Sequence, residues 1–290
     1  MVRMRGVYYF YQDMTLRGLI RLALCVLQTG VLLCGCETIP EGERLIPMSK
    51  VGGARVHVLV EYTGFRCVNC PTAAGVAEEL RQVYGKQLVV VSMHPGSNPF
   101  THGKYDYTCE EADECYRWMG GMSTTPLPTG NLDFGASGSG YFSDYHEWAS
   151  LLAGAETGVV PHLEAYASAD TISGAVRLRV EASATVETAA RMAVWLTEDS
   201  VRGVQAMTDG GVDTAYYHRH LLREALDHEP FGKEVVIGRQ ASTFQYRFEL
   251  AKGYRPRQCR LIVLLMDKED RHIIQAYETE MDFSIVDAVE

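Results

Sequence analysis

One stretch of sequence decides the fold of the first half of the chain: VHVLVEYTGFRCVNCP, residues 56–71. Residues 56–62 are rich in β-branched and aromatic side chains, which favour a strand. A turn follows, and the apolar residues after Pro71 recur at helical spacing until Gly85, which indicates a helix with proline in its first turn. A continuous apolar run at 87–93 then indicates a strand buried on both faces. Strand, Cys-x-x-Cys, helix and strand together predict a βαβ unit.

The pair Cys67 and Cys70 falls where the predicted strand meets the predicted helix. The unpaired N–H groups and the positive dipole at a helix N-terminus lower the pKa of a cysteine placed there and stabilise its thiolate. Arg66 adds positive charge beside it. Because the thiolate attacks disulfides, we predict Cys67 as the nucleophile and Cys70 as the resolving thiol. In a βαβ context this spacing indicates a redox motif rather than a zinc site, with the Cys67–Cys70 disulfide in place of a cofactor.

The chain resembles the thioredoxin superfamily at three places, the first being this dithiol. The segment Leu127-Pro128-Thr129 resembles the cis-proline segment beside the thioredoxin dithiol, and Pro128, unlike Pro126, directly precedes a strand in the family's Pro-Thr order. The resemblance therefore implies a substrate groove shaped by Pro128 and lined by Arg66, Leu127 and Thr129. The third place is Glu61, which stands where thioredoxins have a buried acid implicated in proton transfer to the second cysteine.

A narrower resemblance covers roughly residues 55–290. The run at 61–71 is similar to the Bacteroidetes outer-membrane lipoprotein family related to the 28-kilodalton outer-membrane protein, and segments at 195–199 and 217–226 and Gln205 fit as well. Members combine a thioredoxin-like domain with a C-terminal immunoglobulin-like domain. The resemblance implies an α/β thioredoxin-like domain followed by an all-β immunoglobulin-like sandwich, and it implies little about activity.

Other interpretations of the site residues remain open. Cys67 and Cys70 can form a permanent disulfide that staples the turn. Metal capture would need a third ligand such as His94 or His102, but copper-handling proteins of the thioredoxin fold space their cysteines further apart, so we assign no metal ligands. For Glu61 the alternative is a carboxylate at a strand end that is satisfied by backbone N–H groups or a lysine.

The second half of the chain reads as all-β. Short alternating runs separated by polar turns predict an antiparallel sandwich; they lie at 176–180, 193–196, 244–248, 260–265 and 273–277. An insertion at 205–235 interrupts it, and we predict that its Tyr217–His220 cluster is a helix face packed in its own domain rather than a metal site. The predicted boundaries are signal peptide 1–35, tether 36–54, thioredoxin-like domain 55–157 and sandwich 158–290.

The N-terminus has the pattern of a secretory signal: a basic stretch, roughly 14 apolar residues and a small-residue site. The apolar run is too short to span a bilayer comfortably. Its end, Leu33-Cys34-Gly35-Cys36, resembles a bacterial lipobox and implies a lipid on Cys36; the alternative is a buried cysteine in an uncleaved helix. We therefore expect a lipid-anchored protein of the cell envelope, at the outer membrane.

Charge limits the partners. The chain carries a net −10, and residues 1–35 hold four arginines and one aspartate, a net +3, so the mature chain carries −13. Strong acidity excludes the basic face that a nucleic-acid partner requires. It also opposes docking on anionic lipid, so the lipid on Cys36 must provide the membrane contact. Envelope proteins with cysteines are the expected substrates.

Three further cysteines lie in the folded part. Cys109 and Cys115 are predicted to form a structural disulfide, or alternatively a resolving or relay pair. Six helical residues rise about 9 Å, which exceeds the roughly 7 Å Cα limit for a disulfide, so pairing requires Cys109 to precede the helix expected at 110–119 or the helix to be distorted. Cys259 is predicted to be a lone buried thiol at a strand start.

Two functions therefore compete. One is thiol–disulfide exchange on protein substrates; the other is a non-catalytic lipoprotein that binds a protein or glycan partner and uses Cys67–Cys70 as a staple. A catalytic Cys67 needs an accessible sulfur beside Pro128. Coverage by residues 95–125 or by the second domain would favour the staple.

Overall fold

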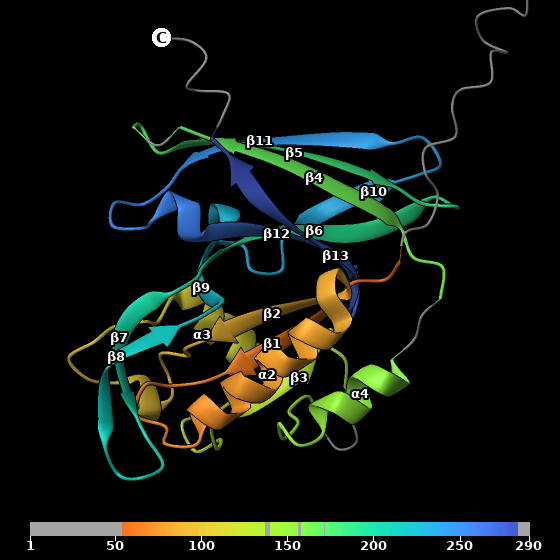
Figure 1. Ribbon diagram of the computed structural model, residues 1–290. Helices are drawn as coiled ribbons and strands as arrows, with labels where there is room; N and C mark the ends of the chain where they lie inside the picture. The colour runs from red at the N-terminus through yellow and green to blue at the C-terminus, as the bar shows by residue number, and fades with distance from the viewer. Residues whose placement is uncertain (1–53, 137–139, 156–157, 171, 284–290) are drawn as a thin grey trace, which may run out of the picture. The chain divides into compact units, whose positions relative to one another are not determined.

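The first part of the chain is built on a mixed sheet with helices on both faces (Figure 1). The computed structural model describes residues 54–136, 140–155, 158–170 and 172–283. β1 (His57–Tyr62) pairs in parallel with β2 (Leu88–Met93) and antiparallel with β3 (Thr129–Leu132), and α2 (Cys70–Tyr84) connects β1 to β2. This is the strand, dithiol, helix and strand order that the sequence predicts.

Both faces of β1 and β2 are buried, as their continuous apolar sequences require. On one face, α2 and α4 (Trp148–Gly154) cover Leu59, Leu88 and Val90. The other face, with Val58 and Val60, packs against α3 (Glu110–Trp118) and against side chains from the second half of the chain. The sheet is thereby fixed on one side by its own helices and on the other by the second half.

The second half is entirely β apart from two short 3-10 turns among its described residues. Its strands are β4 (His162–Ala169), β5 (Ala175–Ser183), β6 (Thr188–Glu198), β7 (Val201–Ala206), β8 (Val212–His218), β9 (Leu221–Ala225), β10 (Lys233–Ile237), β11 (Ser242–Glu249), β12 (Cys259–Asp267) and β13 (Ile273–Asp282). β11, β5 and β4 form one layer, and β13, β12, β6 and β10 form the other, with an apolar core between them. β13 pairs with β12 and, at its end, with β4, so it passes from one layer to the other. The chain is thus mostly β with few helices.

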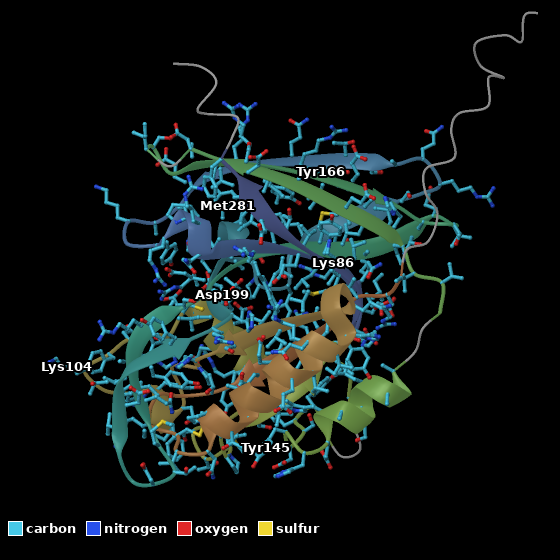
Figure 2. All side chains as sticks on the ribbon, in the orientation of Figure 1. Lys86, Lys104, Tyr145, Tyr166, Asp199 and Met281 are labelled. Carbon is cyan, nitrogen blue, oxygen red and sulfur yellow. A yellow bond between two sulfur atoms is a disulfide. The ribbon has the colours of Figure 1, made fainter. Side chains whose placement is uncertain are left out.

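β9 joins the two halves into one continuous run of paired strands. It pairs antiparallel with β6 and in parallel with β2, through Ser92 and Leu221, and the Ser92 N–H donates to the His220 carbonyl oxygen at 2.8 Å. Asp199 lies at this junction (Figure 2), and its Oδ1 accepts the His220 N–H at 2.8 Å. The described residues all fall within one compact unit.

The insertion departs from the predicted helix. Tyr217 lies in β8, and His220 lies in the turn before β9, so the prediction of a helix face at 217–220 is wrong. The alternating pattern of Tyr216, Tyr217 and His218 suits a strand that pairs with β7 to form a two-stranded hairpin. This hairpin packs on the first half of the chain, not within the sandwich.

The remaining strand and the last helix of the first half, β3 and α4, have the following bounds. β3 starts directly after Pro128 and ends at Leu132, because Asp133 and Phe134 adopt positive φ values of 54° and 55°. The last helix of the first half, α4, begins at Trp148.

The predicted signal peptide, the predicted lipidation site Cys36 and all but the last residue of the predicted tether lie outside the described residues. Within those described ranges, no helix combines the length and apolar character needed to cross a membrane.

Candidate dithiol site

Cys67 and Cys70 form a disulfide at the start of α2, with their Cα atoms 5.4 Å apart. Cys70 is the first helical residue, so the pair lies at the positive end of the helix as predicted. Both cysteines are only 2% exposed and belong to an apolar cluster that includes Tyr62 and Leu127. The disulfide is therefore closed off from solvent in this conformation.

The second half of the chain contributes to this cover through β7. The Gln205 side-chain amide donates to the carbonyl oxygen of Cys67 at 2.8 Å and to that of Gly64 at 3.4 Å. The backbone N–H of Ala206 donates to the Phe65 carbonyl oxygen at 2.8 Å. These bonds tie the loop that carries the dithiol to a strand far away in sequence. Coverage of the dithiol by the second domain is the observation that favours a structural disulfide over a catalytic one.

Glu61 lies on β1 and is 1% exposed. Its Oε2 accepts a hydrogen bond from the Ser92 hydroxyl at 3.1 Å, while Oε1 is buried without a partner among the described residues. Burial raises the pKa of Glu61 from 4.5 to about 7, and the Ser92 hydrogen bond offsets part of the effect. Neither the backbone N–H groups nor the lysine considered for a purely structural carboxylate supply a bond to it. The group can accept or release a proton near neutral pH.

A cleft of about 430 Å³ connects Glu61 with Cys70. One wall is α2, and the opposite wall is β8 with the turn that follows it. Burial, and then the charge of Glu61, raise the pKa of Tyr216 on β8, which lines the same cleft. Sequence reasoning missed this wall, since nothing in the local pattern of β8 points to a partner on β1.

Two histidines line the same cleft, and burial keeps both neutral at pH 7. The pKa of His94 is well below its usual 6.5, through burial first and then through His218 and Arg223. The pKa of His218 is lowered to about 4, again mainly by burial, and its Nε2 lies 3.2 Å from the Val204 carbonyl oxygen. The ring centroids of the two histidines are 5.5 Å apart.

The residues predicted to line a substrate groove differ in how deeply they are buried. The Leu127–Pro128 peptide bond is cis, and Leu127 is buried in the cluster that holds the dithiol. The Thr129 hydroxyl donates to the Ser143 carbonyl oxygen at 3.2 Å. Arg66 is exposed, and its guanidinium contacts the His102 carbonyl oxygen at 3.5 Å. Their role toward a substrate stays a prediction.

Cys109 and Cys115 are free thiols, so the predicted disulfide between them is not formed. Cys109 does precede α3, where it has extended backbone angles, but its Sγ lies 3.8 Å from the Leu222 carbonyl oxygen. Burial raises the pKa of Cys109 to about 12 and that of Cys115 well above its usual value, so neither is a nucleophile at neutral pH. Cys259 is a buried free thiol at the start of β12.

No group of three or more His, Cys, Asp or Glu side chains is arranged to hold a metal ion within the part of the chain that the structure describes. Of the two histidines considered as third ligands, His94 lines the cleft, whereas the His102 ring lies 2.6 Å from the Gly96 carbonyl oxygen on an exposed loop.

A scan against protein-family models and a search of curated proteins both found no match. Among solved structures, the chain is similar to HBP35 of Porphyromonas gingivalis, with 14% identity and a TM-score of 0.61 over 80% of this chain and 77% of that one. Protein AGR_C_4864 from Agrobacterium tumefaciens matches with 13% identity and a TM-score of 0.46, over 79% of this chain and 96% of that one. A domain of the outer membrane lipoprotein Omp28 from Porphyromonas gingivalis matches with 12% identity and a TM-score of 0.29, over 42% and 88%. The chain shares its fold with HBP35 over most of its length.

Proposed function

We propose that the protein is a lipid-anchored thiol–disulfide exchange protein of the bacterial envelope, with a thioredoxin-like first domain and an immunoglobulin-like second domain. The observation that carries the proposal is Glu61: a buried carboxyl group, without an ion-pair partner among the described residues, that lines the same cleft as Cys70. A disulfide that only staples a turn has no use for such a group, because burying it costs stability. A dithiol that gains and loses protons does.

Cys67, Cys70 and Glu61 each have a separate role in the proposed reaction. In the reducing direction, the Cys67 thiolate attacks a substrate disulfide, forms a mixed disulfide and expels one substrate thiolate. Glu61 takes the proton from the Cys70 thiol, and the Cys70 thiolate then attacks the Cys67 sulfur. The Cys67–Cys70 disulfide forms, and the second substrate thiolate leaves and is protonated. The oxidising direction is the reverse.

The cover over the dithiol belongs to this proposal. With both cysteines 2% exposed, the described conformation is the closed, oxidised one. Exchange requires the loop that carries Cys67 to separate from Gln205, which breaks the 2.8 Å hydrogen bond to the Cys67 carbonyl oxygen. The second domain therefore controls access to the dithiol. The lipid on Cys36 would hold both domains near the membrane.

A second candidate is a non-catalytic lipoprotein whose sandwich binds a protein or glycan. The low exposure of Cys67 and Cys70 favours it, since a structural disulfide needs no access.

The redox potential of Cys67–Cys70 separates the two functions. The full chain in detergent is equilibrated in glutathione buffers, and its cysteines are trapped and assigned peptide by peptide by mass spectrometry. A potential of roughly −120 to −270 mV, together with alkylation of Cys67, supports exchange. A redox potential more negative than about −300 mV, with no alkylation of Cys67, would overturn the exchange proposal and favour a structural disulfide.

A further inference from the structure

The cleft between α2 and β8 contains polar atoms whose bonding is incomplete. Glu61 Oε1 and His94 Nδ1 are both buried without a hydrogen-bond partner among the described residues, and both residues line the cleft. The residues are 1% and 2% exposed. Buried polar atoms are almost always paired, so two orphans in one cavity indicate a polar group that is supplied from outside the chain.

The buried end of the cleft offers acceptors rather than donors. His218 is neutral at pH 7 and donates from Nε2 to the Val204 carbonyl oxygen, so its Nδ1 carries the lone pair. Glu61 presents the free carboxyl oxygen. His94 is neutral too, so no histidine brings positive charge to this end. A ligand that donates hydrogen bonds satisfies the Glu61 carboxylate and the lone pair of His218, and also His94 Nδ1 in the tautomer that carries its proton on Nε2.

The charges around the cleft favour a cation. Glu78 is the other glutamate in the lining, and it is already engaged by Arg81, Arg219 and His220. Arg219 has an exposed side chain at the outer end, and Asp213 on β8 adds a further negative charge to the lining. Glu61 has no cationic partner within the described residues. An anion would meet acceptors and carboxylates, whereas an ammonium group brings three N–H donors and a positive charge.

The volume of the cleft and the side chains that line it also favour an ammonium group. A volume of about 430 Å³ lies within the range of small-ligand pockets, roughly 300 to 1,000 Å³. Tyr216 contributes an aromatic ring, whose face attracts cations. On the α2 wall, a side-chain carbon built on Gly75 would meet nothing within 4 Å, so the helix leaves the space open.

We propose that this cleft binds an alkylammonium group, either of a free small amine or of a lysine side chain, with the Glu61 carboxylate as its main partner. Binding does not require disulfide exchange. The ligand ionises Glu61 and pairs with it, and it fills the space beside Gly75.

The test measures binding of n-butylammonium to the oxidised full chain by ligand-observed NMR, with n-butanol and butyrate as uncharged and anionic probes of similar size. Saturable binding of n-butylammonium alone is expected. Glu61→Gln should weaken it by about tenfold or more, because a hydrogen bond to a charged group is lost. Gly75→Phe should abolish it by filling the cleft, whereas Gly75→Ala is the matched control and should leave it intact.

Two pentapeptides that differ only in a central lysine or norleucine identify the source of the amine. A lysine peptide that binds about tenfold tighter than n-butylammonium points to a peptide partner, and equal binding points to a free amine. Absence of saturable binding, equal binding of butyrate, or binding that survives both Glu61→Gln and Gly75→Phe would overturn the proposal. Circular dichroism checks that the variants fold. The redox potential of Cys67–Cys70 is an independent readout, so the two proposals can fail separately.

Discussion

Replacing Glu61 by glutamine tests how much stability the buried carboxyl group costs. The pKa of Glu61 rises from 4.5 to about 7 because the side chain is buried, with only the Ser92 hydroxyl as a hydrogen-bond donor. In the unfolded chain the same group ionises near its ordinary pKa. At about 1.36 kcal/mol for each pKa unit, the difference corresponds to about 3 kcal/mol.

The direction in which the free energy of unfolding changes with pH follows from whether the folded or the unfolded chain holds the Glu61 proton. Between pH 4.5 and about 7, the folded chain keeps the Glu61 proton and the unfolded chain loses it, so the free energy of unfolding falls as pH rises. Below this window the group is protonated in both states, and above it the group is ionised in both. The loss of about 3 kcal/mol therefore builds up across the window and persists above it, and the Glu61→Gln variant does not suffer it.

The assay is urea unfolding of the oxidised full chain and the variant, followed by circular dichroism across the pH window. The quantity of interest is the free energy of unfolding of the variant minus that of the wild type. This difference should rise by about 3 kcal/mol between pH 4.5 and 7 and stay level on either side. His94 and His218 titrate in both proteins, so their contributions cancel. Glu78→Gln is the control: the pKa of Glu78 is lowered, so its difference should have the opposite slope at acidic pH. A difference for Glu61→Gln that does not change with pH would refute the reasoning.

Three further predictions concern the parts that hold the site. Gln205→Ala removes the side-chain donor to the carbonyl oxygen of Cys67, which then keeps only the Cys70 N–H at 3.3 Å. At a cost of roughly 1 kcal/mol, dithiothreitol should reduce the disulfide about fivefold faster; an unchanged rate would show that this bond does not restrain the loop. Glu198 is buried and accepts hydrogen bonds from two arginines, so Glu198→Ala should lower the free energy of unfolding in urea by about 3 kcal/mol, and a loss below about 1 kcal/mol would contradict that. Gly232→Ala should cost more than about 1 kcal/mol, because its φ is +62° and the added carbon overlaps a carbonyl oxygen of β6, whereas Gly238→Ala, with open space around it, should be nearly neutral. Equal thermal midpoints for the two alanine variants would refute that difference.

The elements predicted well are those whose signal is local. The βαβ unit follows from a β-rich run, Cys-x-x-Cys and a helical apolar pattern that ends at Gly85, and α2 ends one residue earlier. β5, β6, β11, β12 and β13 each contain a predicted run. β5 and β11 alternate because one face of each packs on the sandwich core, whereas β6 and β12 are apolar on both faces because they lie between that core and the core of the first half.

The insertion was mispredicted because its pairing partners are remote. The segment 217–226 contains good helix formers, but β9 forms two ladders at once, with β6 and with β2, and these outweigh local propensity. For the same reason, the sequence did not reveal that Gln205 covers the dithiol. Spacing identified Cys67 and Cys70, and the resemblance to thioredoxins pointed to Glu61, whereas the bond from Gln205 to the Cys67 carbonyl oxygen spans 138 positions of sequence.

The place of β9 bears on how the chain folds. β2 is completed by a strand from the far half of the sequence, so its outer edge stays unpaired until residues 221–225 have emerged. An unpaired parallel strand edge is a site for aggregation, and pairings between distant segments form slowly. The first half is therefore vulnerable until the second half has folded against it, and a chain cut at residue 157 would keep that edge exposed permanently.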